Sequence, residues 1–193
     1  MWQASRLAGL LTVAAALVVV MSAQAARPLQ QRTLLVSDLP GFKVDTPPTL
    51  LRSANAWLNC KQSHRYKDAA ALQARGFIAG AREHLYLTRA GLYAADASSS
   101  VIQFKSPQGA LANLNETLPG GNAEFKPFTV PGIPGARGAA TTGVNSDGLI
   151  VAFADGRFSY FLGVAYLPHD ARHPTRASVL AAAQALYRRV HRA

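Results

Sequence analysis

The chain has 193 residues, of which 49% are hydrophobic and 16% charged, and its formal net charge is +10. This composition is typical of a globular protein and excludes a disordered tail. One cysteine, Cys60, excludes an intramolecular disulfide, so the fold must rest on its hydrophobic core. We expect Cys60 to be buried as a small hydrophobic side chain.

The first 25 residues have the pattern of a secretory signal peptide. Arg6 is their only charge, an apolar run covers 7–21, and small residues at Ala23 and Ala25 frame a cleavage site. The run is shorter than the ~20 residues that a bilayer-spanning helix needs. We therefore expect a secreted or extracytoplasmic protein, cleaved after Ala25. Retention of the leader as an N-terminal membrane anchor is the alternative.

The charge of the mature chain indicates the kind of partner. Removal of the leader takes away Arg6 and leaves a net charge of +9. Such a charge favours anionic partners, either a cell-envelope polymer or lipid head groups, and a protein partner is the other candidate. Export argues against nucleic acid. No second apolar stretch reaches spanning length, so we expect no integral membrane span in the mature chain.

The mature chain starts with two segments of low regularity. We predict a flexible tether over 26–33 and a short strand over 34–42 that ends in a Pro-Gly turn. A helix follows, because apolar residues recur at the spacing of one helix face. Its apolar positions are Leu50, Leu51, Ala54, Trp57 and Leu58. A second helix is predicted over 67–75.

The middle of the chain reads as two strands and a helix. Strand-like sequence covers 77–88 and 99–105. Ser106 and Pro107 are a typical N-cap and first-turn proline, so a third helix should begin there and end at 119–122.

The last third predicts a meander and a closing helix. Strands are expected over 136–144, 149–154 and 157–166, with the last two joined by a turn at Asp155-Gly156. A helix then begins near Pro174. Its buried stripe is predicted to be Val179, Leu180, Ala183, Leu186, Tyr187 and Val190.

The strand over 157–166 is largely apolar on both faces. An antiparallel sheet of this kind must be covered on both sides. We therefore predict the α+β class, with a single domain over 34–193 in which helices flank an antiparallel sheet, an α/β/α sandwich.

This order of elements, behind a secretion leader, is similar to that of the PsbP/Mog1-like α/β/α sandwich domains. The segments "DLPGF" (38–42) and "VIQFKSPQGA" (101–110) carry the resemblance, which is to bacterial exported modules of actinobacterial type. It implies a protein that binds or stabilises a partner and does not catalyse a reaction. None of the family's binding residues maps onto this chain.

The glycine-rich run "VPGIPGARG" (130–138) is the first candidate site. Phosphate-binding loops place such glycines before a helix, whereas a strand-like segment follows here. We interpret the run as a bend between strands and keep Arg137 as a candidate ligand contact, because a guanidinium suits anions.

A second candidate lies on the strand over 77–88. Strand periodicity places Arg82, His84 and Tyr86 on one face and Glu83 on the other. These three are predicted ligand contacts if their face lines a groove, and solvent-facing residues otherwise.

His169 and His173 are four residues apart, yet prolines flank them and no third ligand follows, so we predict no metal site. No motif predicts a cofactor. No nucleophile signature and no paired carboxylates occur, which favours a non-enzymatic binding or accessory module. Two alternatives stay open. One is an extracytoplasmic hydrolase with His84, His169 or His173 as base, and the other is a small-molecule carrier with an apolar pocket.

Overall fold

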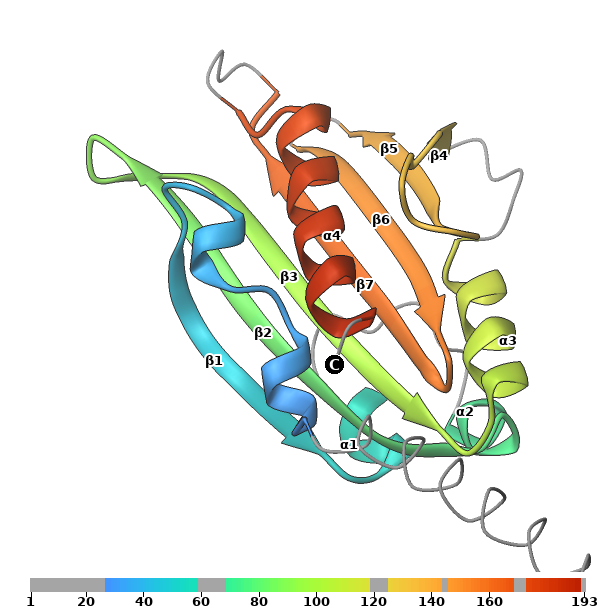
Figure 1. Ribbon diagram of the computed structural model, residues 1–193. Coiled ribbons are helices and arrows are strands. Elements are labelled where there is room, and N and C mark those ends of the chain that lie inside the picture. Colours follow the sequence, from blue (N-terminus) through green and yellow to red (C-terminus); the bar gives the residue numbers. More distant parts are fainter. Residues whose placement is uncertain (1–26, 59–68, 119–124, 144–145, 169–172, 192–193) are drawn as a thin grey trace, which may run out of the picture.

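The computed structural model describes residues 27–58, 69–118, 125–143, 146–168 and 173–191 (Figure 1). Several predictions fall outside the described residues, namely those for the leader and its cleavage site, Cys60, the helix end at 119–122 and His169.

Seven strands form one sheet in the order β1-β2-β3-β7-β6-β5-β4 (Figure 1). Every neighbouring pair is antiparallel. The strands are β1 (Lys43–Leu51), β2 (Phe77–Arg89), β3 (Leu92–Phe104), β4 (Phe125–Phe128), β5 (Arg137–Thr142), β6 (Asp147–Asp155) and β7 (Phe158–Tyr166). The predicted α+β class, an antiparallel sheet with flanking helices, is confirmed.

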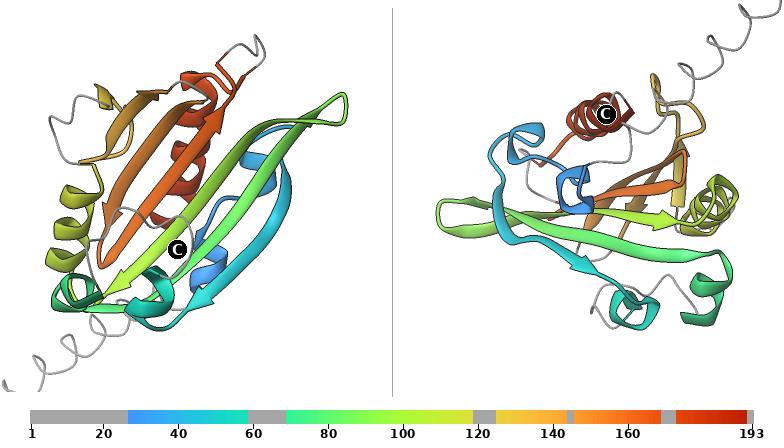
Figure 2. Two further views of the ribbon diagram at one scale, coloured as in Figure 1. Left: turned by 180° about the vertical axis from the view of Figure 1, so that it is seen from behind. Right: turned by 60° about the horizontal axis from the view of Figure 1, so that its bottom comes forward.

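Helices lie on both sides of this sheet, as Figure 2 shows. The described helices are α1 (Ala54–Leu58), α2 (Ala69–Ala74), α3 (Pro107–Thr117) and α4 (Arg176–His191), with 3-10 turns η2 (Leu29–Arg32) and η3 (Val36–Asp38). The α4 helix and the 3-10 turns lie over one face, and α1 and α2 lie under the other (Figure 2). None of these helices is both long and apolar enough to cross a membrane.

The largest core lies between the sheet and α4. Alternate residues of β6 and β7 point toward the helix, among them Phe153 and Tyr160, whose rings stack at 4.7 Å. Val179, Ala183 and Leu186 of α4 cover them. The predicted buried stripe of the closing helix is therefore confirmed at Val179, Ala183 and Leu186.

The opposite face has two smaller cores. Trp57 of α1 packs with Leu72 and Phe104 in one of them. Leu114 of α3 packs with Ile150 of β6 in the other. Between these two cores the sheet carries small and polar side chains, and the candidate site lies there.

Two predictions for the N-terminal segment are wrong. The predicted tether is packed against the sheet, with Arg32 and Thr33 only 3% and 2% exposed. The Arg32 guanidinium donates to the Tyr160 hydroxyl (3.2 Å) and lies over the Phe158 ring. The predicted strand over 34–42 contains η3 instead, because the Asp38 carboxylate accepts the backbone N–H of Leu35 (2.8 Å) and closes a tight turn.

The predicted first helix begins too early. Leu50 and Leu51 belong to β1, where they pair with Ala81 and Gly80 of β2. The helix starts at Ala54, after Ser53, whose hydroxyl accepts the backbone N–H of Ala56 (3.1 Å) as an N-cap does.

The predicted N-cap of α3 and the predicted β6–β7 turn agree with the structure to within one residue. Ser106 caps α3 by accepting the Gly109 N–H (3.2 Å), as predicted. The β6–β7 hairpin forms, but its two loop residues are Gly156 and Arg157, one position later than predicted. Asp155 pairs with Phe158, and Gly156 takes the positive φ of 54° that the turn requires.

Candidate functional site

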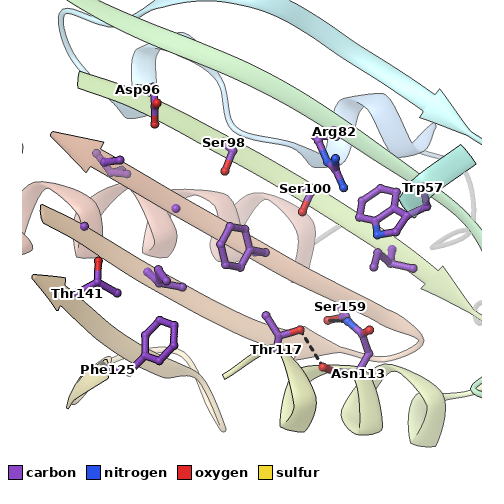
Figure 3. Close-up of a pocket in the computed structure, with 17 residues that line it drawn as sticks. Trp57, Arg82, Asp96, Ser98, Ser100, Asn113, Thr117, Phe125, Thr141 and Ser159 are labelled. Atoms are coloured by element: carbon purple, nitrogen blue, oxygen red, sulfur yellow. Dashed lines mark hydrogen bonds between the residues drawn. The ribbon is translucent and has the colours of Figure 1, made fainter. Parts of the chain in front are cut away.

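A groove of about 330 Å³ lies on the sheet face opposite α4 (Figure 3). Trp57 of α1 stands at one side, and Asn113 and Thr117 of α3 stand at another. Strands β2 to β7 supply the rest of the lining, chiefly Arg82, Asp96, Ser98, Ser100, Ile102, Phe125, Thr141, Ile150, Ser159, Phe161 and Gly163.

The groove exists because β7 alternates large and small residues. Tyr160, Leu162 and Val164 are buried in the core under α4. The intervening residues face the groove, and most of them are small. At Gly163 a Cβ atom would come within 2.9 Å of the Phe161 ring, so this ring lies across the glycine. A larger residue at Gly163 would displace the ring and fill the groove.

One end of the groove carries a buried cation. Arg82 is 9% exposed, and the central carbon of its guanidinium lies 4.4 Å from the Trp57 ring centre. Trp57 sits against Gly80, where a Cβ atom would overlap the indole. Ser100 pairs with Arg82 across β2 and β3, and Figure 3 shows all three side chains at the same end.

Buried polar atoms without a hydrogen-bond partner in the described part of the chain occur in the lining. Among them are the indole Nε1 of Trp57 and the Oδ1 of Asn113. The Asn113 amide is held in place, since its Nδ2 donates to the Ser159 hydroxyl at 3.0 Å. A buried polar group without a partner costs about 1–3 kcal/mol. A bound molecule with complementary groups would recover part of this cost.

Beside the groove, the Arg82 strand face continues to His84 and Tyr86. His84 pairs with Ser98, and Tyr86 pairs with Asp96. Burial, followed by the positive charge of Arg82, holds the pKa of His84 below its ordinary value, while nearby acidic groups oppose this shift. The imidazole is therefore neutral at pH 7.

The structure separates the four predicted contact residues. Arg82 lines the groove, and His84 and Tyr86 lie on the same strand next to it. Arg137 lies at the start of β5, outside the lining. Its guanidinium donates to the Leu118 carbonyl (3.2 Å) and to Oδ1 of Asn115 (2.6 Å), and so ties β5 to the C-terminal end of α3.

The groove also contains residues that the sequence reasoning missed. Trp57 was expected only as core, and Asn113 and Ser159 had no predicted role. Strand alternation over 98–100 could have placed two of the lining residues, because Ser98 and Ser100 line the groove whereas Ser99 faces the other side of the sheet. The two helix residues had no such signal.

A second buried polar cluster lies on the α4 face and does not line the groove. Glu83 is 3% exposed, and its burial raises its pKa to about 7, although hydrogen bonding to Thr33 and Leu34 and the charge of Arg189 lower it. Arg189 pairs with Asp38 at 3.0 Å. This cluster fastens the N-terminal segment to the sheet.

No three His, Cys, Asp or Glu side chains gather as a metal site among the described residues. His173, one of the two histidines weighed as ligands, stacks on Tyr166 with the ring centres 4.4 Å apart.

No protein family and no curated protein matches the chain. Among solved structures it is similar to the extracellular domain of PknH from Mycobacterium tuberculosis, with 12% identity and a TM-score of 0.55 over 86% of this chain and 95% of that one. It is also similar to an uncharacterized protein from Mycobacterium smegmatis, the Rv0999 ortholog, with 11% identity and a TM-score of 0.44 over 82% and 97%. The first likeness shows a shared fold, and the PsbP/Mog1-like resemblance stays a prediction.

Proposed function

We propose that the protein is an extracytoplasmic, non-enzymatic binding module whose groove holds a small molecule. The groove itself carries the proposal. Its volume of about 330 Å³ is in the range of ligand sites, and its lining combines apolar side chains with polar ones that could orient a bound molecule. The predicted secretion leader and the occurrence of this fold in an extracellular domain support the location.

The groove favours a small ligand, or the end group of a larger envelope component, over a flat protein partner. The net charge of +9 in the mature chain would assist the approach of an anionic ligand by electrostatic steering. Of the four contacts predicted from the sequence, we keep Arg82 as a direct contact, with His84 and Tyr86 at the border.

The test uses an uncharged fluorescent probe, N-phenyl-1-naphthylamine, so that charge does not influence the result. We expect saturable binding to the wild type. Ser98→Leu places an apolar side chain in the groove and should weaken binding at least tenfold. The matched control Ser37→Leu adds the same group at an exposed site on the α4 side and should leave binding unchanged. Equal binding by all three proteins, or no binding by the wild type, would contradict the proposal.

Hydrolysis is a second candidate, because the strand register places His84 opposite Ser98. A neutral imidazole is the form that a general base needs. However, no hydrogen bond joins these two described side chains, so the serine is not activated in this arrangement. Turnover of 4-nitrophenyl butyrate that both His84→Gln and Ser98→Ala abolish would favour the hydrolase. The binding function predicts only the buffer rate for all three proteins.

A further inference from the structure

The floor of the groove has a hollow of small residues at the end away from Trp57 (Figure 3). One row of directly opposed residues crosses five strands there and lines the groove: Asp96 of β3, Ala165 of β7, Gly148 of β6, Thr141 of β5 and Phe125 of β4. Because the alanine and the glycine are small, the hollow lies between Asp96 and Thr141. These two residues are three strand spacings apart, which is about 14 Å.

Two hydroxyl groups lie over glycines at the edges of this hollow. A Cβ atom on Gly163 would lie 3.4 Å from the Oγ of Ser98. A Cβ atom on Gly148 would lie 2.5 Å from the Oγ1 of Thr141. Hydroxyl groups both donate and accept hydrogen bonds, so this hollow suits a ligand whose own groups do the same.

The charges around the hollow disfavour an ionic ligand. Asp96 is exposed, and its Oδ2 accepts the Tyr93 hydroxyl at 2.5 Å. The carboxylate repels anions from the hollow, and the net charge of +9 in the mature chain opposes the approach of cations. A ligand hydroxyl, in contrast, can donate to the Asp96 carboxylate. This end of the groove therefore favours a neutral ligand with several hydroxyl groups.

An amide on the α3 side of the groove is an independent observation. Asn113 lines the groove and is 2% exposed, and its Oδ1 has no hydrogen-bond partner among the described residues. A ligand hydroxyl that donates to this oxygen gives it a hydrogen bond that it lacks in the free protein. The amide is bonded to Ser159, which precedes Gly163 by four positions on β7, or about 13 Å. A ligand that contacts both the hollow and Asn113 is therefore longer than one sugar ring.

We infer that the groove binds a short neutral saccharide, with one sugar ring in the hollow and a linked ring toward Asn113. The inference rests on the proposed function and adds the class of ligand. In the hollow, the ring hydroxyls exchange hydrogen bonds with Ser98 and Thr141 and donate to Asp96. The C–H groups of the ring pack on Ala165 and beside Phe125.

The experiment compares three neutral disaccharides, maltose, cellobiose and trehalose, with tetrahydropyran-2-methanol, a ring that lacks the ring hydroxyls. NMR titrations of the wild type follow the backbone amide resonances of Gly148 and Gly163. At least one disaccharide should shift them with saturation and bind at least tenfold more tightly than tetrahydropyran-2-methanol. Glucuronate should bind at least threefold more weakly than glucose, because Asp96 repels its carboxylate. No saturable shift with any disaccharide, equal affinity for tetrahydropyran-2-methanol, or equal affinity for glucuronate and glucose overturns the inference.

Two matched variants test the hydroxyl contact. Thr141→Val keeps the shape of the side chain and removes its hydroxyl, so it should weaken the tightest disaccharide at least threefold. Binding of N-phenyl-1-naphthylamine should change by less than twofold. The control Thr142→Val makes the same exchange at the next residue of β5, which is exposed and faces away from the groove, and should bind like the wild type. Equal losses in the two variants, or no loss in Thr141→Val, would contradict the inference.

The apolar probe separates this inference from the proposed function. If N-phenyl-1-naphthylamine binds and Ser98→Leu weakens it, while no disaccharide binds, the class of ligand is wrong and the binding function stands. If that probe does not bind either, both proposals fail.

Discussion

Glu83 should make the protein less stable as the pH rises through neutrality. Its pKa in the folded state is about 7, against 4.5 for a solvent-exposed glutamate, because burial disfavours the charged form. Between these values the folded protein keeps a proton that the unfolded chain has lost, so stability falls with increasing pH. At 1.36 kcal/mol per pH unit, the free energy of unfolding falls by about 3 kcal/mol in total. This fall begins above pH 4.5 and is complete above pH 7.

The variant Glu83→Gln isolates this effect, since glutamine has nearly the same shape and does not ionise. Urea unfolding of both proteins at pH 5 and pH 8 gives the comparison. We expect the free energy of unfolding of the variant, relative to that of the wild type, to rise by about 2–3 kcal/mol between pH 5 and pH 8. A carboxyl titration followed by NMR should place the Glu83 midpoint near 7. A stability difference that is the same at both pH values, or larger at pH 5, would refute the reasoning.

Three further predictions concern the backbone and the groove walls. Ala90 has a φ of 50° in the β2–β3 turn, so Ala90→Asn should stabilise the protein by about 0.5–1 kcal/mol, and an unchanged urea midpoint would contradict this. Gly80→Ala should displace the Trp57 ring and cost about 1–3 kcal/mol, which the same unfolding assay measures, and a neutral effect would show that the contact is not tight. Arg137→Gln loses two hydrogen bonds and should cost about 1–3 kcal/mol without altering N-phenyl-1-naphthylamine binding, and weakened binding would place Arg137 in the site after all.

The sequence predicts the regular parts of this fold well, because there side-chain periodicity and burial agree. The β6–β7 hairpin and α4 are examples. The N-terminal segment is different. Arg32 and Thr33 are polar but buried. The Arg32 guanidinium donates to the Tyr160 hydroxyl, and no local pattern reveals a partner so distant in the chain.

The prolines at 47 and 48 are a related case. Prolines argue against a strand, yet β1 is an edge strand whose register shifts beside them, and an edge position tolerates the missing N–H groups. Here the position of the strand in the sheet decides the outcome, and the sequence alone does not reveal it.

The candidate site could be predicted only on its strand side. Period-two alternation places Arg82 and Ser100 correctly, because each belongs to a long strand. Trp57 and Asn113 come from two helices that the sheet topology brings to the same face. Arg137 follows a turn, and its direction depends on Asn115 of α3, which no motif connects to it.

The central claim is that the groove of this protein binds one small molecule. Native mass spectrometry with N-phenyl-1-naphthylamine tests it most directly, since it counts the bound molecules. We predict one bound probe on the wild type and on Ser37→Leu, and none on Ser98→Leu at the same concentration. A bare polypeptide mass for the wild type, or the same complex with Ser98→Leu, would contradict the claim.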